Sequence, residues 1–148
     1  MADTPVVYWD ASAVLSALFS DSHSQSAKKW ANINGLHLIS TFAYAEVCAV
    51  IARMIREKVL PKKGAKAAFE ILEKGPWRKI AVHPEWQMMR SLSAKWPLRS
   101  ADLWHLTAAK SLVNELPELA VLTFDKRLQA AAKRTGTRTA ETEVTSIG

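Results

Sequence analysis

The sequence predicts an α/β domain in which helices cover both faces of a parallel sheet. Short apolar runs, rich in β-branched and aromatic residues, alternate with longer stretches whose apolar residues recur at helical spacing. This alternation is typical of parallel strands joined by right-handed helical crossovers. The 148 residues suit a single domain, placed at 1–148, and contain no linker, repeat or low-complexity block.

The first part of the chain predicts two buried strands, each followed by helix. Residues 6–9, Val-Val-Tyr-Trp, have the apolar and aromatic character of a buried strand, and a helix over 12–19 follows. A second short helix at 24–31 ends before Gly35, which precedes a strand at 36–39.

Two longer helices come next. Thr41 can cap a helix that runs to about Lys58, because its apolar residues recur at helical spacing. Pro61 suits the first turn of the following helix, which ends near Gly75-Pro76.

The rest of the chain predicts three further strands and three helices. They are a strand at 80–82, a helix from Pro84 to Trp96, a helix from Ala101 to about Leu116 capped by Ser100, a strand at 120–124, a helix at 126–134 stopped by Gly136, and an edge strand at 137–139. Trp86, Met89 and Trp96 recur at helical spacing, which favours the core; large aromatic residues also anchor interfaces.

The positive charge of the chain is confined to one stretch. Residues 53–79 carry nine basic and three acidic side chains, which accounts for the whole net charge of +6. A cluster of this kind suits a polyanion such as RNA, although a solvated helix surface has the same composition. One cysteine, Cys48, excludes an intrachain disulfide, and no apolar run approaches the roughly 20 residues that span a bilayer. With no basic leader before an apolar stretch, we expect a cytoplasmic protein without a membrane partner.

Four acidic residues lie beside apolar sequence. Asp10 and Asp125 end the predicted strands at 6–9 and 120–124, and Asp102 opens a helix. Glu46 lies within an apolar helix pattern and has no lysine or arginine three or four residues away. Each aspartate also has an ordinary explanation as a helix cap or a first-turn charge. A buried carboxylate must otherwise be protonated, paired from elsewhere or bound to a cation.

Strand ends at one edge of a parallel sheet are where ligands bind, so these acids can converge there. Two like charges about 4 Å apart repel by about 4 kcal/mol at an effective dielectric of 20. Mg²⁺ or Mn²⁺ would relieve that repulsion and keep waters for chemistry. Ser12 and Thr123, each two residues from a strand-end aspartate, can orient carboxylates or water, or make local turn bonds only.

Other kinds of site are less well supported. Four scattered histidines and one cysteine give no zinc spacing, and the chain has no Walker phosphate loop or GxSxG elbow. His105 shares a helix face with Asp102, where a packed histidine is the simpler interpretation than a contact to metal-bound water or RNA. A phosphotransferase with Asp10 as nucleophile would usually have a second aspartate two residues on, where this chain has Ser12.

Taken in order, four segments resemble the PIN-domain ribonucleases, and among them the VapC-type toxins of toxin–antitoxin pairs. The segments are VVYWDASAVLSAL with Asp10 and Ser12, ISTFAYAEVCAVIAR with Glu46, SADLWHLTAAK with Asp102, and VLTFDKRLQAAAKRTG with Thr123 and Asp125. They span nearly the whole chain. The sequence differs from the family's pattern at Ala11, where threonine is common, and in the bulky Trp104 beside Asp102.

The resemblance implies a three-layer fold with a central parallel sheet of about five strands flanked by helices. It implies a Mg²⁺- or Mn²⁺-dependent endoribonuclease that hydrolyses RNA phosphodiester bonds, with Asp10, Glu46, Asp102 and Asp125 as metal ligands. It also implies an antitoxin partner whose tail covers the site, and a homodimer. The alternative is a catalytically silent module that binds RNA or a partner on the same scaffold.

Overall fold

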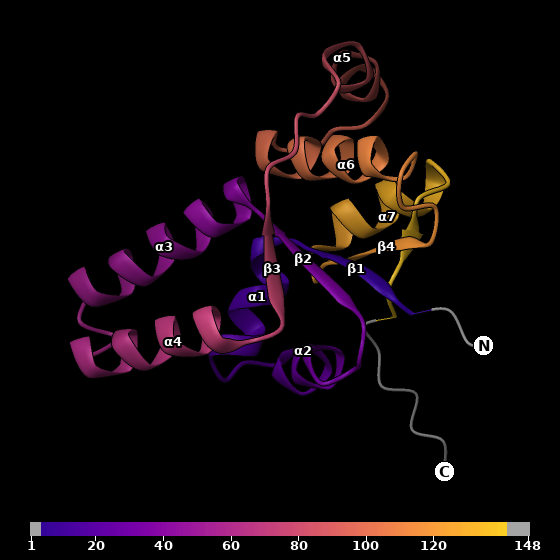
Figure 1. The fold of residues 1–148 in the computed structure, drawn as a ribbon. Coiled ribbons are helices and arrows are strands. Elements are labelled where there is room, and N and C mark those ends of the chain that lie inside the picture. The colour runs from indigo at the N-terminus through magenta and orange to yellow at the C-terminus, as the bar shows by residue number, and fades with distance from the viewer. Residues whose placement is uncertain (1–3, 142–148) are drawn as a thin grey trace.

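The computed structural model describes residues 4–141, which form a five-stranded, all-parallel sheet between layers of helices (Figure 1). The strand order is β3-β2-β1-β4-β5. β1 (Val6–Trp9) is central and pairs with β2 (Leu36–Ser40) on one side and β4 (Leu119–Leu122) on the other. β3 (Trp77–Ile80) and β5 (Arg138–Thr139) form the edges. The predicted α/β class and its five-stranded parallel sheet are confirmed.

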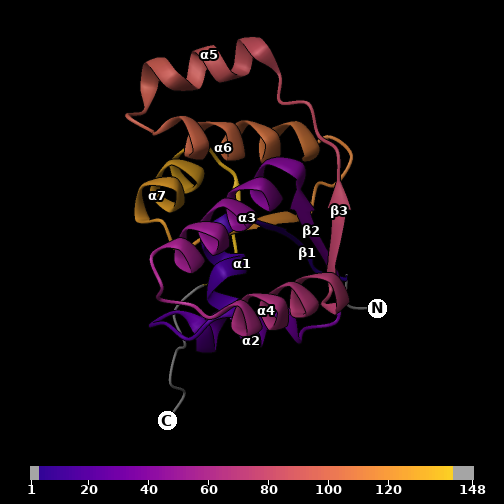
Figure 2. The same cartoon turned by 90° about the vertical axis from the view of Figure 1, so that its left-hand side faces the viewer.

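Seven helices connect these strands within the described residues. They are α1 (Ala11–Leu18), α2 (Ser24–Ala31), α3 (Thr41–Arg56), α4 (Lys62–Lys74), α5 (Trp86–Lys95), α6 (Ser100–Leu112) and α7 (Lys126–Arg134). Helices α1 to α4 cover one face of the sheet and α6 and α7 the other, while α5 packs outside α6 (Figures 1 and 2). No helix between residues 4 and 141 is both long enough and apolar enough to cross a membrane.

The central strand is buried on both faces, which explains its continuous apolar sequence. Val7 and Trp9 point into the cluster formed with α1, α3 and α4. Val6 and Tyr8 point the other way, into the cluster formed with α6. Because β1 is fixed from both sides, the residue that follows it, Asp10, has a well-defined position.

The predicted strand at 80–82 is misplaced, since β3 begins three residues earlier, at Trp77, and ends two residues earlier, at Ile80. Trp77 is buried and packs edge-on against Trp9 at a ring separation of 5.3 Å, whereas Arg78 and Lys79 are exposed. Charged side chains are common on edge strands because they discourage pairing with other chains. In β3, Arg78 and Lys79 interrupt the apolar pattern by which a buried strand is recognised in a sequence.

Both predicted helix caps of serine or threonine type also need correction. The cap of α3 is Ser40, whose Oγ accepts a hydrogen bond from the Ala43 N–H at 3.1 Å; Thr41 is the first helical residue. Ser100 is likewise the first residue of α6 and not its cap. The expected core position of Trp86 is wrong too, since its side chain is 88% exposed.

Candidate active site

The four predicted acids lie near the carboxyl ends of the parallel strands. Asp10 directly follows β1, and Asp125 follows the neighbouring strand β4 and caps α7. Glu46 lies in the second turn of α3, which begins where β2 ends, and Asp102 lies in the first turn of α6. Since the crossovers leave β1 and β4 in opposite directions along the sheet, these strand ends form its topological switch point, the usual ligand position in such folds.

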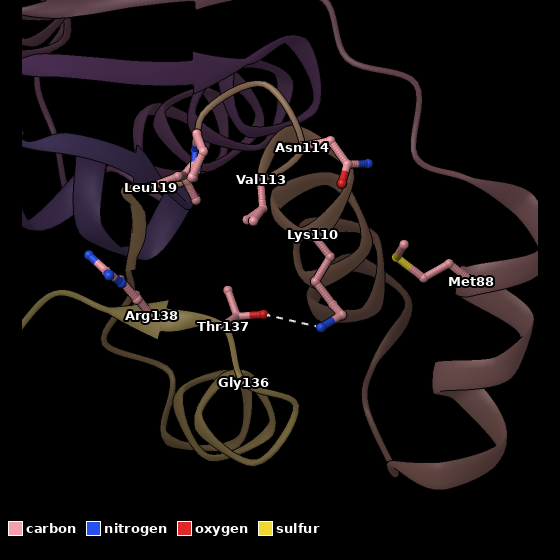
Figure 3. Close-up of a pocket in the computed structure, with 9 residues that line it drawn as sticks. Met88, Lys110, Val113, Asn114, Leu119, Gly136, Thr137 and Arg138 are labelled. Carbon is pink, nitrogen blue, oxygen red and sulfur yellow. Dashed lines mark hydrogen bonds between the residues drawn. The ribbon is translucent and has the colours of Figure 1, made fainter.

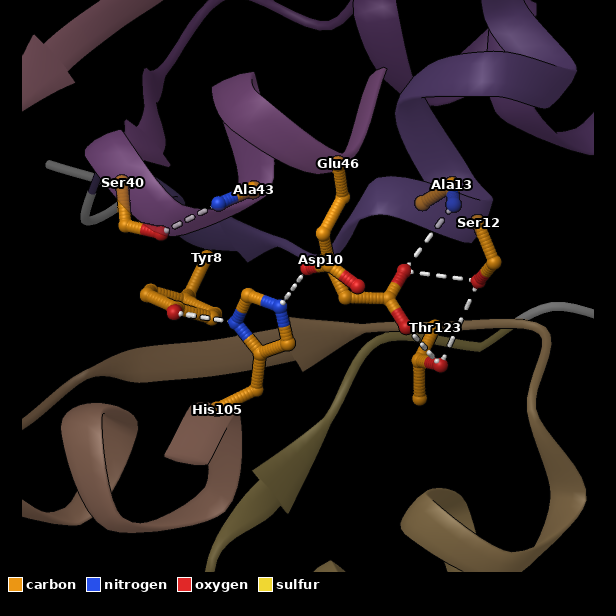
Figure 4. Close-up of polar contacts among 9 residues, drawn as sticks. All are labelled: Tyr8, Asp10, Ser12, Ala13, Ser40, Ala43, Glu46, His105 and Thr123. Atoms are coloured by element: carbon orange, nitrogen blue, oxygen red, sulfur yellow. Dashed lines mark hydrogen bonds and ion pairs between the residues drawn. The ribbon is translucent and has the colours of Figure 1, made fainter. Parts of the chain in front are cut away.

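Asp10 is only 4% exposed, and both of its carboxylate oxygens accept hydrogen bonds (Figure 4). Oδ1 accepts from the Ala13 N–H at 2.9 Å and from the Ser12 hydroxyl at 2.7 Å, and Oδ2 accepts from the Thr123 hydroxyl at 2.5 Å. Burial raises the pKa of Asp10, and these hydrogen bonds oppose that rise. The residue therefore caps α1, and its carboxyl group is buried.

Ser12 and Thr123 join the ends of two neighbouring strands. The Ser12 Oγ accepts from the Phe124 N–H at 3.2 Å, and the Thr123 Oγ1 accepts from the Asp125 N–H at 3.0 Å. Both hydroxyls bind Asp10 as well. Of the two predicted roles, the geometry fits the orientation of a carboxylate, combined with local turn bonds at Thr123.

Asp102 is 8% exposed and lies close to two other carboxylates. Its pKa is raised to about 6, mainly by burial and then by the negative charges of Asp125 and Asp10. A hydrogen bond with Asp125 contributes in the same direction. Three of the predicted acids thus interact electrostatically, and a proton partly relieves their repulsion.

Glu46 is paired from elsewhere in the chain, which is one of the three outcomes that its apolar helical neighbours predict. The Nε2 of His105 lies 2.6 Å from its Oε1, and the Nδ1 of His105 lies 2.7 Å from the Tyr8 hydroxyl (Figure 4). His105 is 2% exposed, so it is a packed histidine, as expected, but one that holds a site carboxylate. Burial raises the pKa of Tyr8, and the charges of Asp10 and Glu46 add to the rise. Glu46 is therefore connected through His105 and Tyr8 to the strand that Asp10 follows.

Tyr8 is a residue of this network that the sequence analysis did not identify. It lies in the middle of a strand that was expected to be purely structural. The signal that identifies it is spacing: Tyr8 and Asp10 are two residues apart, so they would share a face of an extended strand.

The donor set fits a hard divalent cation. It consists of carboxylate oxygens, and within residues 4–141 none of the four acids forms an ion pair with lysine or arginine. With their side chains as they stand, no three His, Cys, Asp or Glu residues of the described chain are placed to hold an ion. Glu46 is hydrogen-bonded to His105 through Oε1, and Asp102 is hydrogen-bonded to Asp125.

A separate hollow of about 300 Å³ lies between α6 and β5 (Figure 3). Lys110 lines it and donates from Nζ to the Thr135 carbonyl at 2.9 Å. Leu119, the first residue of β4, also lines it. The hollow is thus at the amino end of β4, whereas Asp125 follows the carboxyl end, so it forms no part of the acidic site.

A sequence model of the PIN domain matches residues 7–134, a range that includes all four acids. The chain belongs to the PIN-domain family. The PIN fold places Asp10, Glu46, Asp102 and Asp125 as described above, on four different elements at the switch point of its sheet.

Solved structures share the fold at low sequence identity. PAE2754 from Pyrobaculum aerophilum is 14% identical, with a TM-score of 0.60 over 86% of this chain and 79% of the other. VapBC2 from Rickettsia felis, bound to a promoter DNA fragment, is 15% identical, with a TM-score of 0.64 over 92% and 97%. VapC20 from Mycobacterium tuberculosis, named as a toxin that cleaves the sarcin–ricin loop, is 15% identical, with a TM-score of 0.59 over 91% and 98%. No curated protein sequence matches this PIN-domain chain significantly.

Proposed function

We propose that this PIN-domain protein is a divalent-metal-dependent endoribonuclease that hydrolyses RNA phosphodiester bonds. The observation that carries the proposal is the meeting of Asp10, Asp102 and Asp125 at the switch point, where no lysine or arginine of residues 4–141 forms an ion pair with them. An anionic, oxygen-rich pocket repels the phosphate of RNA unless cations bind between them. The PIN family membership and the positive charge of residues 53–79, which suits a polyanion, support RNA as the substrate.

Asp10, Glu46, Asp102 and Asp125 would hold Mg²⁺ or Mn²⁺. When bound, the ion supplies activation of water and neutralisation of charge on the phosphate. Ser12 and Thr123 keep the Asp10 carboxylate in one orientation through their hydroxyls. Asp102, whose pKa is raised to about 6, would have to be ionised to hold the cation.

The basic residues lie where they can bind RNA that extends away from the acids. Helices α3 and α4 form a hairpin that projects from the sheet (Figure 1). Arg53 is seven residues beyond Glu46 on α3, roughly 10 Å along the helix axis. Lys58, Lys62 and Lys63 are exposed around the turn of the hairpin, farther from Glu46 along the chain. Contacts of these residues to phosphates would be sequence-independent and sensitive to salt.

We further propose that this single domain, 1–148, is the toxin of a toxin–antitoxin pair that acts in the cytoplasm as a homodimer. The support is the likeness of its fold to VapBC2 and to the toxin VapC20. The cognate antitoxin would cover the acidic site with its tail.

The direct test is incubation of purified protein with total cellular RNA, with Mn²⁺ and then with EDTA, followed by mapping of new RNA ends. We expect defined products with Mn²⁺ only. Asp10→Asn should abolish cleavage while the fold survives, because the amide oxygen can still cap α1. Glu118→Gln is the matched control, since Glu118 is an exposed acid at the opposite end of β4. Full activity of a clean Asp10→Asn preparation would exclude the proposed role of the acids.

The second candidate is a catalytically silent module that binds RNA or a protein partner. It is favoured by the side-chain positions of Glu46 and Asp102, which are engaged with His105 and Asp125 and do not form an ion site as they stand. A silent module would bind RNA equally well with Mn²⁺ or EDTA and would leave it intact. The same incubation therefore separates the two candidates.

A further inference from the structure

Two stacked pairs of aromatic rings lie beside the acidic site. His23 and Phe124 stack with a ring separation of 4.5 Å and an interplanar angle of 9°. Phe42 and Trp104 stack with a separation of 4.9 Å and an angle of 21°. His23 is exposed and the other three rings are half-buried, so both pairs have surface in contact with solvent.

The first pair is attached to the Asp10 and Asp125 side of the site. Phe124 lies between Thr123 and Asp125 in the sequence, and its backbone N–H donates to the Ser12 hydroxyl that also binds Asp10. His23 immediately precedes α2 and reaches Phe124 from a distant part of the chain. The Ser12 hydroxyl therefore links the backbone of Phe124 to the Asp10 carboxyl group and fixes the position of this ring pair relative to Asp10.

The second pair is attached to the Glu46 side. Phe42 lies one helical turn before Glu46 on α3, and Trp104 lies two residues after Asp102 on α6. Both rings meet the ring of His105 edge-on at 5.4 Å, and His105 contacts Glu46. Figure 4 shows Asp10 with Glu46 and His105 on one side and Ser12 and Thr123 on the other. The two ring pairs thus belong to opposite sides of Asp10.

We propose that these two pairs are stacking platforms for unpaired nucleobases on either side of the phosphate that the acids act on. The inference rests on the proposed ribonuclease function and assigns these two ring pairs as the groups that would hold the bases of its substrate. Bases stack on aromatic side chains regardless of sequence, and each stacked base strengthens binding roughly five- to 150-fold. In a duplex the base faces are covered by neighbouring bases, so the platforms have nothing to bind.

Charge supports the same conclusion. The acids repel RNA, and Arg53, the first basic residue of the α3–α4 hairpin, lies about 10 Å beyond Glu46 along the helix axis. Stacking supplies attraction that does not depend on charge, next to the carboxylates. It also orients the sugar–phosphate backbone, because two fixed bases determine where the phosphate between them lies.

The test measures binding of a short single-stranded RNA in EDTA, so that no cleavage takes place. We compare it with the same sequence in a duplex and with an abasic strand that has the same ribose–phosphate backbone. Trp104→Leu and His23→Ala should each weaken binding of the single strand roughly five-fold or more. The wild-type protein should bind the duplex and the abasic strand more weakly than the single strand, and the variants should lose nothing further on the abasic strand.

Matched controls are available in this chain. Trp86→Leu removes an exposed tryptophan from α5, and His83→Ala removes an exposed histidine before α5; neither should change binding. Because Trp104 packs partly against the core, thermal unfolding must show that Trp104→Leu is folded. His23 is exposed and caps α2 without a side-chain hydrogen bond, so we expect His23→Ala to disturb the fold less than Trp104→Leu.

Equal binding of normal and abasic strands, or unchanged binding by both ring variants, would overturn the proposal. So would ring variants that bind RNA normally but lose a purified protein partner, since that result assigns the rings to a protein interface. These results are independent of catalysis. Base-dependent binding without cleavage would refute the proposed nuclease function and support the stacking platforms. Cleavage of RNA combined with unchanged binding by the ring variants would support the nuclease function and refute the platforms.

Discussion

Tyr8 and His105 together determine where the Glu46 carboxylate lies. Because burial raises the pKa of Tyr8, its hydroxyl keeps its proton and can donate it to His105 Nδ1. We infer that Nε2 then carries the ring hydrogen and donates it to Glu46. The tautomer of one buried histidine thus links a central strand to a residue of the acidic site.

Replacing Tyr8 with phenylalanine should loosen this arrangement. The buried Nδ1 of His105 would lose its partner, which should cost about 1–3 kcal/mol of stability and free the ring to turn. We expect a lower unfolding temperature and a higher Mn²⁺ concentration for half-maximal RNA cleavage. Tyr44→Phe is the control, since the Tyr44 hydroxyl donates to Glu73 on α4. An unchanged Mn²⁺ requirement in Tyr8→Phe would show that Tyr8 does not position Glu46.

The raised pKa of Asp102 gives the metal-free protein a specific pH dependence. Its folded-state pKa of about 6 exceeds the usual value of 3.8, so between these values the folded state binds more protons than the unfolded state. The contribution of Asp102 to stability therefore falls as pH rises from about 4 to 6, and the loss is complete above that range. Asp10, whose pKa is also raised by burial, acts in the same direction.

Asp102→Asn should remove this contribution. In EDTA, we expect the variant to gain stability relative to wild type at pH 7 and to gain little at pH 4, where Asp102 is protonated in the folded state and about half protonated in the unfolded state. Thermal unfolding of both proteins at the two pH values measures the difference. A gain that is the same at both pH values would contradict the assigned cause.

Among the elements, the turn after α7 depends on the backbone of a single glycine. Gly136 has a φ of +80°, and a Cβ added there would meet nothing within 4 Å. Gly136→Ala should therefore destabilise the protein by about 1–2 kcal/mol through backbone conformation alone. Gly136→Asn should cost less, because asparagine tolerates this conformation. Denaturant unfolding measures both, and equal costs would indicate a cause other than φ.

Elements with a strong apolar pattern could be predicted from the sequence, and those whose position depends on tertiary contacts could not. β1, α2 and α7 match their predicted bounds, since each has a clear pattern with a stop beside it. β3 was misplaced because only Trp77 of its first three residues faces the core. Trp86 was predicted to be buried because large residues recur at helical spacing around it. It is exposed because its helix, α5, packs only on the outer side of α6.

At the scale of the whole molecule, the site combines four elements that are far apart in sequence. Strand-end position was enough to predict Asp10 and Asp125, because parallel neighbours end at one edge. The Tyr8–His105–Glu46 contacts depend on how α3 and α6 pack at that edge, which no local pattern specifies. The sequence therefore predicted the acids of the site but not the groups that hold Glu46.

Metal binding should stabilise the whole domain, since the four acids come from four elements that are brought together only in the folded state. At a Mn²⁺ concentration of 100 times its dissociation constant, the gain should be about 2.7 kcal/mol. We expect a higher unfolding temperature with Mn²⁺, reversal by EDTA, and a smaller gain in Asp125→Asn. Glu118→Gln should respond as the wild type does. The absence of any Mn²⁺ effect on the wild type would favour the silent module.

The central place of β1 also affects the order in which the site is completed during synthesis. Asp10 leaves the ribosome early, but its partner Thr123 and the strand that pairs with β1 on that side are made more than a hundred residues later. A nascent chain that has not yet released residue 125 holds an incomplete set of carboxylates. If the protein cleaves RNA as proposed, a nascent chain therefore cannot cleave its own messenger RNA or ribosomal RNA during most of its translation.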